Sequence, residues 1–191
     1  AHFQAMSATL RPLRFTRRSL VLGNLLRGTR DRRAQKWQRV IQYPQGTIYD
    51  VVAKVDQYSL FLPWCRSSRV LSHTLDADGA GELQTEIGVG FESGLISLQS
   101  SFNSTVTLEP MKRVHSVSEP NEYVEHLSFT WDFAPLGDRA CRLDLQLEFG
   151  LKNAEHGLLW ELAQDKIVSE YMRSFSKRCG DLASLAEGQD A

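Results

Sequence analysis

The chain has 191 residues, of which 42% are hydrophobic and 24% are charged, a balance typical of one globular domain with a tail. It has no run of 18 apolar residues, so the sequence predicts no membrane-spanning helix. The net charge of −1 hides an asymmetry: residues 1–39 carry ten basic residues and one acid, whereas residues 40–191 carry 12 basic and 22 acidic residues.

The basic N-terminal segment has two interpretations. An Arg-rich, nearly acid-free stretch with scattered leucines is typical of a mitochondrial transit peptide. The alternative is a basic arm that stays on the protein and binds RNA or anionic lipid. We therefore predict an arm or transit peptide at residues 1–36, a folded domain at 37–186 and a tail at 187–191.

The folded domain is predicted to open with a strand and two short helices. Residues 37–43 have the composition of a strand and are followed by a turn. Thr47, with Asp50 three residues later, has the spacing of a capping box and predicts the start of a short helix. A second helical turn is predicted at residues 58–62, ended by Pro63.

Beyond residue 65 the hydrophobic pattern has a period of two, which indicates strands. The pattern predicts six of them, at residues 66–75, 81–91, 98–108, 114–118, 127–133 and 141–151. The alternation is cleanest in the last two, where apolar and polar residues take turns without a break. Such alternation gives one buried and one solvated face, as in an antiparallel sheet.

The last long segment, residues 153–185, has sustained helical periodicity, with Asn153 as its predicted N-cap. Its apolar face consists of Ile167, Val168, Tyr171, Met172, Phe175, Cys179 and Leu182. We predict an α+β fold of the helix-grip type, in which a curved antiparallel sheet of six or seven strands wraps around this helix. Because curvature separates the two layers, a lipid-sized cavity of roughly 300–1,000 Å³ is predicted between them.

Motifs for catalysis or metal binding are not found. The chain has no G-x-S-x-G, H-E-x-x-H or P-loop sequence, and no histidine lies at ligand spacing to another ligand. The glycines of residues 88–94 lie between two strands and are interpreted as a bent strand and turn at the mouth of the cavity. Cys65, Cys141 and Cys179 form no CxxC pair and are predicted to be reduced, small apolar residues.

The segment Tyr58–Cys65 concentrates large apolar side chains beside a helix stop. One interpretation is that Phe61 and Trp64 fill the core at one end of the sheet. The other is a hydrophobic gate or an edge that touches a membrane, because Tyr and Trp combine an apolar ring with a polar tip.

This segment also carries a family resemblance. The residues concerned are Asp50-Val51-Val52-Ala53, Val55-Asp56-Gln57-Tyr58, Phe61–Cys65, Phe129–Phe133, Phe149 and Phe175–Cys179. In type and order these residues resemble those of the mitochondrial coenzyme Q-binding proteins, which belong to the START-like, polyketide cyclase superfamily. The resemblance covers residues 37–182. The segment Phe91–Asn103 departs from that family, because it looks longer and more polar than the corresponding loop.

The resemblance implies a helix-grip fold that binds ubiquinone or a related prenyl lipid without catalysis, as a carrier or chaperone for respiration and coenzyme Q synthesis. It implies a mitochondrial protein on the matrix side of the inner membrane, with that membrane surface as a partner. One alternative is an accessory subunit of a respiratory complex or mitoribosome, anchored by the basic arm. Another is a cyclase-type enzyme, since fold alone does not determine function.

The residues predicted to contact the lipid come from four parts of the chain. They are Phe61, Leu62 and Trp64 after the short helices, Phe91, then Leu127, Phe129, Trp131 and Leu145 on the last strands, and Val168, Met172 and Phe175 on the long helix. No catalytic residue, metal ligand or cofactor is predicted.

Overall fold

The computed structural model describes residues 32–93 and 96–187; within them, the side chains of residues 91–93, 96–98, 154–165 and 186–187 are not described. The elements are β1 (Arg32–Ile41), α1 (Gln45–Ala53), the 3₁₀ helix η1 (Val55–Leu60), β2 (Cys65–Leu75), β3 (Gly81–Ser93), β4 (Ile96–Glu109), β5 (Arg113–Ser118), β6 (Val124–Pro135), β7 (Cys141–Leu151) and α2 (Ala154–Glu187). The predicted α+β class and helix-grip architecture are confirmed.

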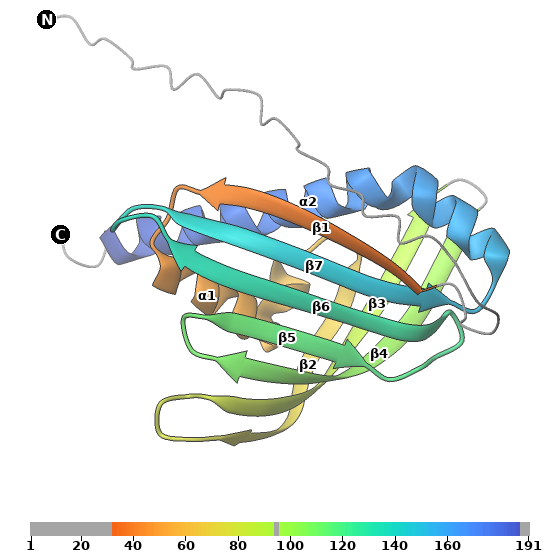
Figure 1. Cartoon of the computed structure of the whole chain (residues 1–191), viewed down its shortest axis with the longest axis horizontal. Coiled ribbons are helices and arrows are strands. Elements are labelled where there is room, and N and C mark those ends of the chain that lie inside the picture. The colour runs from red at the N-terminus through yellow and green to blue at the C-terminus, as the bar shows by residue number, and fades with distance from the viewer. Residues whose placement is uncertain (1–31, 94–95, 188–191) are drawn as a thin grey trace, which may run out of the picture.

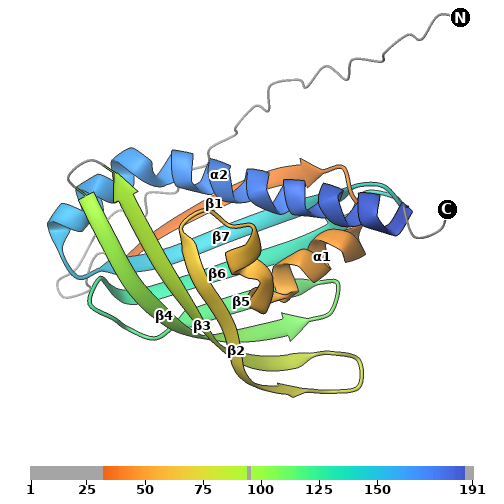
Figure 2. The ribbon, with the colours of Figure 1, turned by 180° about the vertical axis from the view of Figure 1, so that it is seen from behind.

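The strands form one sheet in the order β1-β7-β6-β5-β4-β3-β2, and every neighbouring pair is antiparallel. The sheet curves strongly, so that β3 and β4 run at a steep angle to β6 and β7 (Figure 1). Helices α2 and α1 lie on the same face of the sheet (Figure 2). We call the face of the sheet that they cover the inner face.

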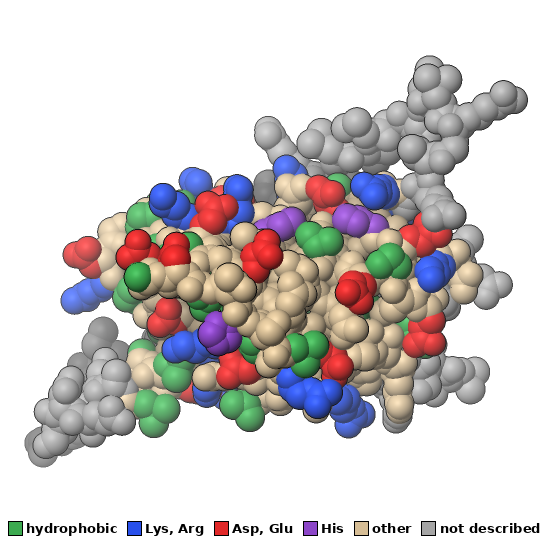
Figure 3. All heavy atoms as spheres, turned by 90° about the horizontal axis from the view of Figure 1, so that it is seen from below, with side chains coloured by type: hydrophobic (Ala, Val, Ile, Leu, Met, Phe, Trp, Pro, Cys, Tyr) green, Lys and Arg blue, Asp and Glu red, His purple; other side chains and the backbone are tan. Residues whose placement is uncertain are grey.

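The strand register divides the residues of β6 and β7 between the two faces. On the inner face, Phe129 is opposite Leu147, Trp131 opposite Leu145, and Phe133 opposite Leu143. The polar residues between them lie on the outer face, where Arg113 of β5 pairs with Asp132 of β6 at 2.7 Å. Acidic and basic side chains are interspersed on the side seen in Figure 3, and apolar side chains occur there only in small separate groups.

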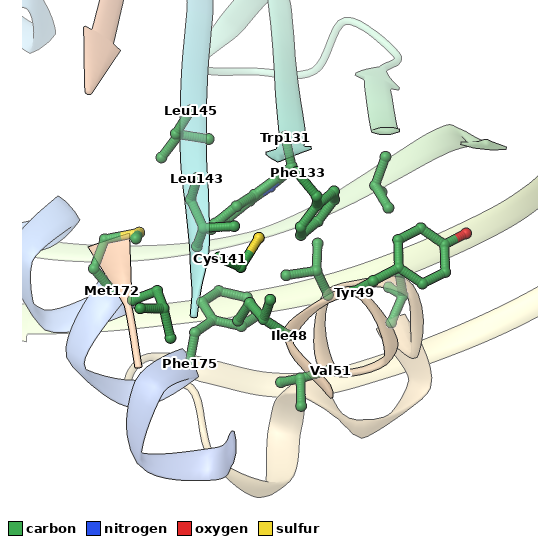
Figure 4. Packing of buried hydrophobic residues seen from close by; sticks show 14 of the residues in the cluster. Ile48, Tyr49, Val51, Trp131, Phe133, Cys141, Leu143, Leu145, Met172 and Phe175 are labelled. Carbon is green, nitrogen blue, oxygen red and sulfur yellow. The ribbon is translucent and has the colours of Figure 1, made fainter. Parts of the chain in front are cut away.

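The main core lies where α1 and the second half of α2 meet the sheet. Ile48 and Val52 of α1 are fully buried, and Val51 is 3% exposed. Figure 4 shows Ile48 of α1 beside Phe175 of α2, and both belong to the cluster that covers the inner face of β6 and β7. The apolar stripe predicted on the long helix is therefore covered as expected at this end.

The first strand is longer than predicted, because it begins at Arg32 rather than at residue 37. Its first residues are mostly polar and show no apolar alternation, so the sequence gives no strand signal there. Backbone pairing accounts for the difference: ten successive residues of β1 pair with β7, beginning with Arg32 opposite Gly150. A long neighbouring strand offers hydrogen-bond partners regardless of side-chain type.

The predicted capping box at Thr47 is wrong. Helix α1 begins at Gln45, with Pro44 as the N-cap and no side-chain cap hydrogen bond. Gln45 instead donates its amide to the carbonyl oxygens of Met111, at 2.6 Å, and Phe133, at 3.2 Å. These tertiary bonds anchor the start of the helix to the sheet, which local spacing could not predict.

The second helical turn was predicted at residues 58–62 and is observed at Val55–Leu60. The six strands after residue 65 appear where the alternation predicts them, with ends that differ by a few residues. Helix α2 begins at Ala154, directly after the predicted N-cap Asn153. No described helix combines the length and hydropathy needed to cross a bilayer.

Candidate functional site

The inner face of the sheet contains two regions of different packing. We call the first the packed half; it comprises Trp131, Phe133, Cys141, Leu143 and Leu145 of the sheet with Val168, Met172, Phe175 and Cys179 of α2, all at most 8% exposed. The ring centroids of Trp131 and Phe175 lie 5.0 Å apart at 62°. Five of the predicted lipid contacts, namely Trp131, Leu145, Val168, Met172 and Phe175, belong to this packed half.

We call the second region the open half; its apolar residues are Val70 of β2, Ile87 of β3, Phe102 of β4, and Leu127 and Phe129 of β6. They lie on the inner face by strand register, yet all five are only half-buried. Apolar side chains on a covered face normally become fully buried. Their residual exposure indicates that the side chains that the structure describes do not completely fill the space above them.

Aromatic rings form the contact between the 3₁₀ helix η1, with the residue that follows it, and α2. Tyr58, Phe61 and Phe175 contact one another edge to face, with centroid distances of 5.3–5.9 Å. The Tyr58 hydroxyl donates to the carbonyl oxygen of Val52. Burial, with a smaller contribution from Cys65, raises the pKa of Tyr58, so this hydroxyl stays protonated and acts as a structural donor.

Trp64 ties the segment after η1 to two other elements. Its carbonyl oxygen accepts a hydrogen bond from the Gly90 N–H at 2.8 Å, and its ring lies 6.0 Å from that of Tyr171 on α2. Its φ of 63° is unfavourable for a bulky residue by about 1–3 kcal/mol. The strain persists because the ring and the carbonyl are both held, so the position of Trp64 beside β3 and α2 is well determined.

Arg178 of α2 holds η1 from the other side. Its Nη2 donates to Gln57 Oε1 at 3.0 Å, and its guanidinium lies 5.9 Å from the centroid of the Phe61 ring. Its Nε is buried and has no hydrogen-bond partner in the part of the chain that the structure describes. Phe61 is thus held between Phe175 and a cation, as part of a fixed wall.

The structure clarifies the two interpretations of the Tyr58–Cys65 segment. Phe61 and Leu62 are half-buried and pack against the core cluster. Leu60, by contrast, is 72% exposed. The segment therefore closes one end of the core and also presents an apolar side chain to solvent. The side chain of Phe91 lies outside the described residues.

The segment Phe91–Asn103, where the chain was expected to depart from the family, lies at the end of the β3–β4 hairpin. Strand β3 extends to Ser93, two residues beyond its predicted end, and β4 begins at Ile96, two residues before its predicted start. The hairpin pairing runs as far as Ser93 opposite Ile96. Continuous backbone pairing explains why this polar stretch is extended rather than irregular.

Sequence reasoning missed a group of buried hydroxyls on the inner face, which we call the hydroxyl row: Thr85 of β3, Ser104 of β4 and Ser118 of β5, exposed by 1%, 5% and 8%. Thr85 Oγ1 donates to the Ser104 carbonyl oxygen at 3.2 Å, and the hydroxyls of Ser104 and Ser118 are 2.9 Å apart. The period of two places each on the inner face, but only the strand register brings them together.

Strand β1 has ionisable side chains at positions that lie on the inner face by strand register. Arg33 and Arg39 alternate there with the buried Trp37 and Ile41 and are themselves half-buried. Burial, then the nearby charge of Arg173, lowers the pKa of Arg39. Within residues 32–93 and 96–187, no group of three His, Cys, Asp or Glu side chains lies close enough together to hold a metal ion. The three cysteines are free thiols.

Comparisons with known proteins agree with this geometry. A family model described as polyketide cyclase / dehydrase and lipid transport matches residues 41–176. Coenzyme Q-binding protein COQ10 homolog B, mitochondrial, of Xenopus laevis is 30% identical over 152 residues, which cover 78% of this chain and 59% of that protein. The chain thus spans less than two thirds of that relative's length.

Two further similarities extend the comparison. Ribosome association toxin RatA of Pseudomonas aeruginosa is 28% identical over 136 residues, covering 69% of this chain and 88% of the toxin. The crystal structure of the Zhui aromatase/cyclase from Streptomyces sp. R1128 superimposes with a TM-score of 0.66 at 14% identity, covering 78% of this chain and 94% of that one.

The similarity to the aromatase/cyclase shows a shared fold alone, because the identity is low. The sequence resemblance to mitochondrial coenzyme Q-binding proteins is confirmed by the Xenopus relative and by others from Schizosaccharomyces pombe, Dictyostelium discoideum and Drosophila melanogaster. With the family model matching most of the folded domain, the chain belongs to the polyketide cyclase / dehydrase and lipid transport family.

Proposed function

We propose that this protein binds ubiquinone or a related prenyl lipid, without catalysis, between the open half of the sheet and α2. The observation that carries the proposal is the half-buried apolar surface of the open half, found in a chain whose relatives are named coenzyme Q-binding proteins. An apolar tail placed there gains about 0.8 kcal/mol for each CH₂ group removed from water.

The predicted lipid contacts whose side chains the structure describes divide into four groups in this proposal. Leu127 and Phe129 form the floor, Trp131 and Phe175 form the end wall towards the packed half, and Phe61, Leu62 and Trp64 border the site. Leu145, Val168 and Met172 support that wall from within the core. A site of this kind needs only a few polar groups to orient its ligand.

We further propose that the protein acts as a carrier or chaperone for this lipid in mitochondrial respiration and coenzyme Q synthesis, on the matrix side of the inner membrane. The names of its relatives, which are mitochondrial coenzyme Q-binding proteins, support this assignment. The exposed Leu60, next to Phe61 in the chain, is a suitable first contact with a membrane surface.

The binding proposal is tested with purified protein. Organic extraction followed by mass spectrometry is expected to show a co-purified prenylquinone. Incubation with phosphatidylcholine vesicles that contain ubiquinone is expected to transfer quinone to the protein. Protein that carries no prenyl lipid and takes none from the vesicles would contradict the proposal.

A second candidate function is an accessory role on a ribosome or another large mitochondrial assembly. It is favoured by the match over 88% of a protein named a ribosome association toxin. Co-sedimentation of the whole chain with mitochondrial ribosomes, reversed by salt, would support it, because contacts with RNA phosphates weaken as salt rises. A protein that stays at the top of the gradient at low salt would exclude ribosome binding.

A further inference from the structure

The hydroxyl row crosses the inner face at one level of the sheet. Strand register places Val70 opposite Thr85, Thr85 opposite Ser104, Ser104 opposite Ser118, and Ser118 opposite Leu127. The row therefore begins and ends at apolar residues of the open half. The next inner-face residues along the strands, Ile87 with Phe102 on one side and Leu83 with Val106 on the other, are also apolar.

The hydrogen bonds within the row leave one proton without an acceptor. Each hydroxyl has one proton to donate and two lone pairs. Ser104 and Ser118 share a single hydrogen bond, so whichever residue donates, the proton of the other has no acceptor among the described residues. A buried donor without an acceptor is destabilising, so a hydrogen-bonding group is expected to complete the pair.

Ser116 adds a second available hydroxyl beside the row. It lies on the inner phase of β5, opposite Phe129 and Val106, and is half-buried. Its side chain makes no hydrogen bond to any other residue that the structure describes. Ser116 and Ser118 are two residues apart on one strand, so their side chains leave the same face of the sheet.

We propose that Ser104, Ser116 and Ser118 form the polar end of the lipid site and bind a carbonyl or phenolic oxygen on the ring of the ligand. This inference rests on the proposed function for the location of the ligand, and it adds a chemical class: a prenyl or alkyl ring that carries oxygen. The ring then lies against β4 and β5, and the tail extends over the apolar residues of the open half.

The chemistry of hydroxyls suits both forms of a redox-active ring. A hydroxyl donates to a quinone carbonyl and accepts from a phenol, so one pair of serines recognises either. A charged side chain in this position would favour one form. An apolar site without the row would hold a hydrocarbon equally well, so discrimination between oxygenated and hydrocarbon rings is the property to measure.

The experiment measures uptake of three probes from phosphatidylcholine vesicles, quantified by mass spectrometry. The probes are decylubiquinone, 4-decylphenol and decylbenzene, which share a ten-carbon chain and differ in ring oxygens. The proteins are the wild type, S104A/S118A, S116A and the matched control S128A. Ser128 is also a buried serine, 6% exposed, but it lies on the outer face, near His126.

The wild type is expected to prefer decylubiquinone and 4-decylphenol over decylbenzene. S104A/S118A is expected to lower the affinity for the two oxygenated probes about tenfold, as expected for the loss of a buried hydrogen bond, while decylbenzene changes less than about twofold. S128A should behave as the wild type. S116A removes a hydroxyl that makes no hydrogen bond to the described residues, so this variant should fold normally and lose part of the preference. It keeps the test valid if the double variant unfolds.

The outcomes separate this inference from the proposed function. If the wild type takes up decylubiquinone and the hydroxyl variants keep the full preference, the inference is overturned and the proposed function stands. If the wild type takes up 4-decylphenol in preference to decylbenzene but no decylubiquinone, quinone binding is excluded, and loss of that preference in the variants sustains the inference. Equal uptake of all three probes, or of none, overturns the inference.

Discussion

The packed half and the open half of the inner face are built from the same alternating pattern but differ in what covers them. In the packed half, Leu143 of β7 is 1% exposed beneath α1 and the second half of α2. In the open half, Leu127 of β6 lies on the same face and is only half-buried. The difference shows that the alternating pattern directs a side chain towards the inner face, whereas the elements that cover that face decide whether the side chain is completely packed.

The largest effect is expected from truncating one leucine in each half. Leu143→Ala should lower the free energy of unfolding by about 2–5 kcal/mol, because it removes buried methyl groups and leaves a cavity. Leu127→Ala should cost about 1 kcal/mol, because its side chain has fewer packing contacts to lose. Urea denaturation measures both, and equal losses would show that the two halves are packed alike.

Replacing the same two leucines by a larger side chain also tests whether the two halves are packed differently. Leu143→Phe should destabilise the protein by about 1–3 kcal/mol through overpacking. Leu127→Phe should change stability by less than about 0.5 kcal/mol and should reduce uptake of decylubiquinone, because the added ring occupies the proposed site. Undiminished uptake by Leu127→Phe would place the lipid elsewhere.

The pH dependence of stability tests how strongly two side chains of α2 are buried. Burial raises the pKa of the Cys179 thiol from 9.0 to about 12 and that of Tyr171 from 10.0 to about 12. Both groups are neutral when protonated, so their contribution is complete below their unfolded pKa values and is lost as pH rises towards 12. Each should lower the free energy of unfolding by about 1.4 kcal/mol per pH unit in that window.

The control for this pH effect is Cys179→Ala. Between pH 9 and 10 thiols titrate in the unfolded chain before tyrosine does, so the variant should lose the Cys179 share of the slope and keep the shares of Cys65 and Cys141, whose pKa values burial also raises. Above pH 10 it should still lack the Cys179 share but keep that of Tyr171. Urea titrations at half-unit steps provide the measurement. An unchanged slope between pH 9 and 10 in the variant would show that Cys179 titrates as freely in the folded protein as in the unfolded one.

A smaller effect is expected from removing the contacts of Arg178 with η1 and Phe61. Arg178→Met keeps the aliphatic stem but removes the bond to Gln57 and the cation near Phe61, and should cost about 1 kcal/mol. Hydrogen exchange should also become faster in η1. Lys177→Met, which replaces a cation 77% exposed on the same helix, is the control and should change stability by less than about 0.5 kcal/mol. Equal effects of the two substitutions would contradict a specific role for Arg178.

Several features of the fold could be predicted because they depend on local patterns. The alternation in residues 127–133 and 141–151 predicted two strands and their inner faces correctly. The three- and four-residue spacing around Met172 and Phe175 predicted α2 and its buried stripe. In each case the period of the side chains matches the repeat of a single element.

Other features depended on contacts between distant residues. The start of α1 follows the bonds of Gln45 to Met111 and Phe133 rather than a local cap. The ring of Phe61 contacts that of Phe175, although the two residues are more than a hundred positions apart. Neither pairing has a signal in the local sequence.

The sequence by itself determined which residues face the helix and which face solvent, because strand and helix periods are properties of a short stretch of chain. It also determined the family, through a few residues in the right order. Only the tertiary structure decided that residues 32–36 belong to the sheet, that Trp131 and Phe175 fill the space between the layers while Leu127 and Phe129 do not, and that three hydroxyls meet on neighbouring strands. These features follow from strand register and sheet curvature, which are set by long-range pairing.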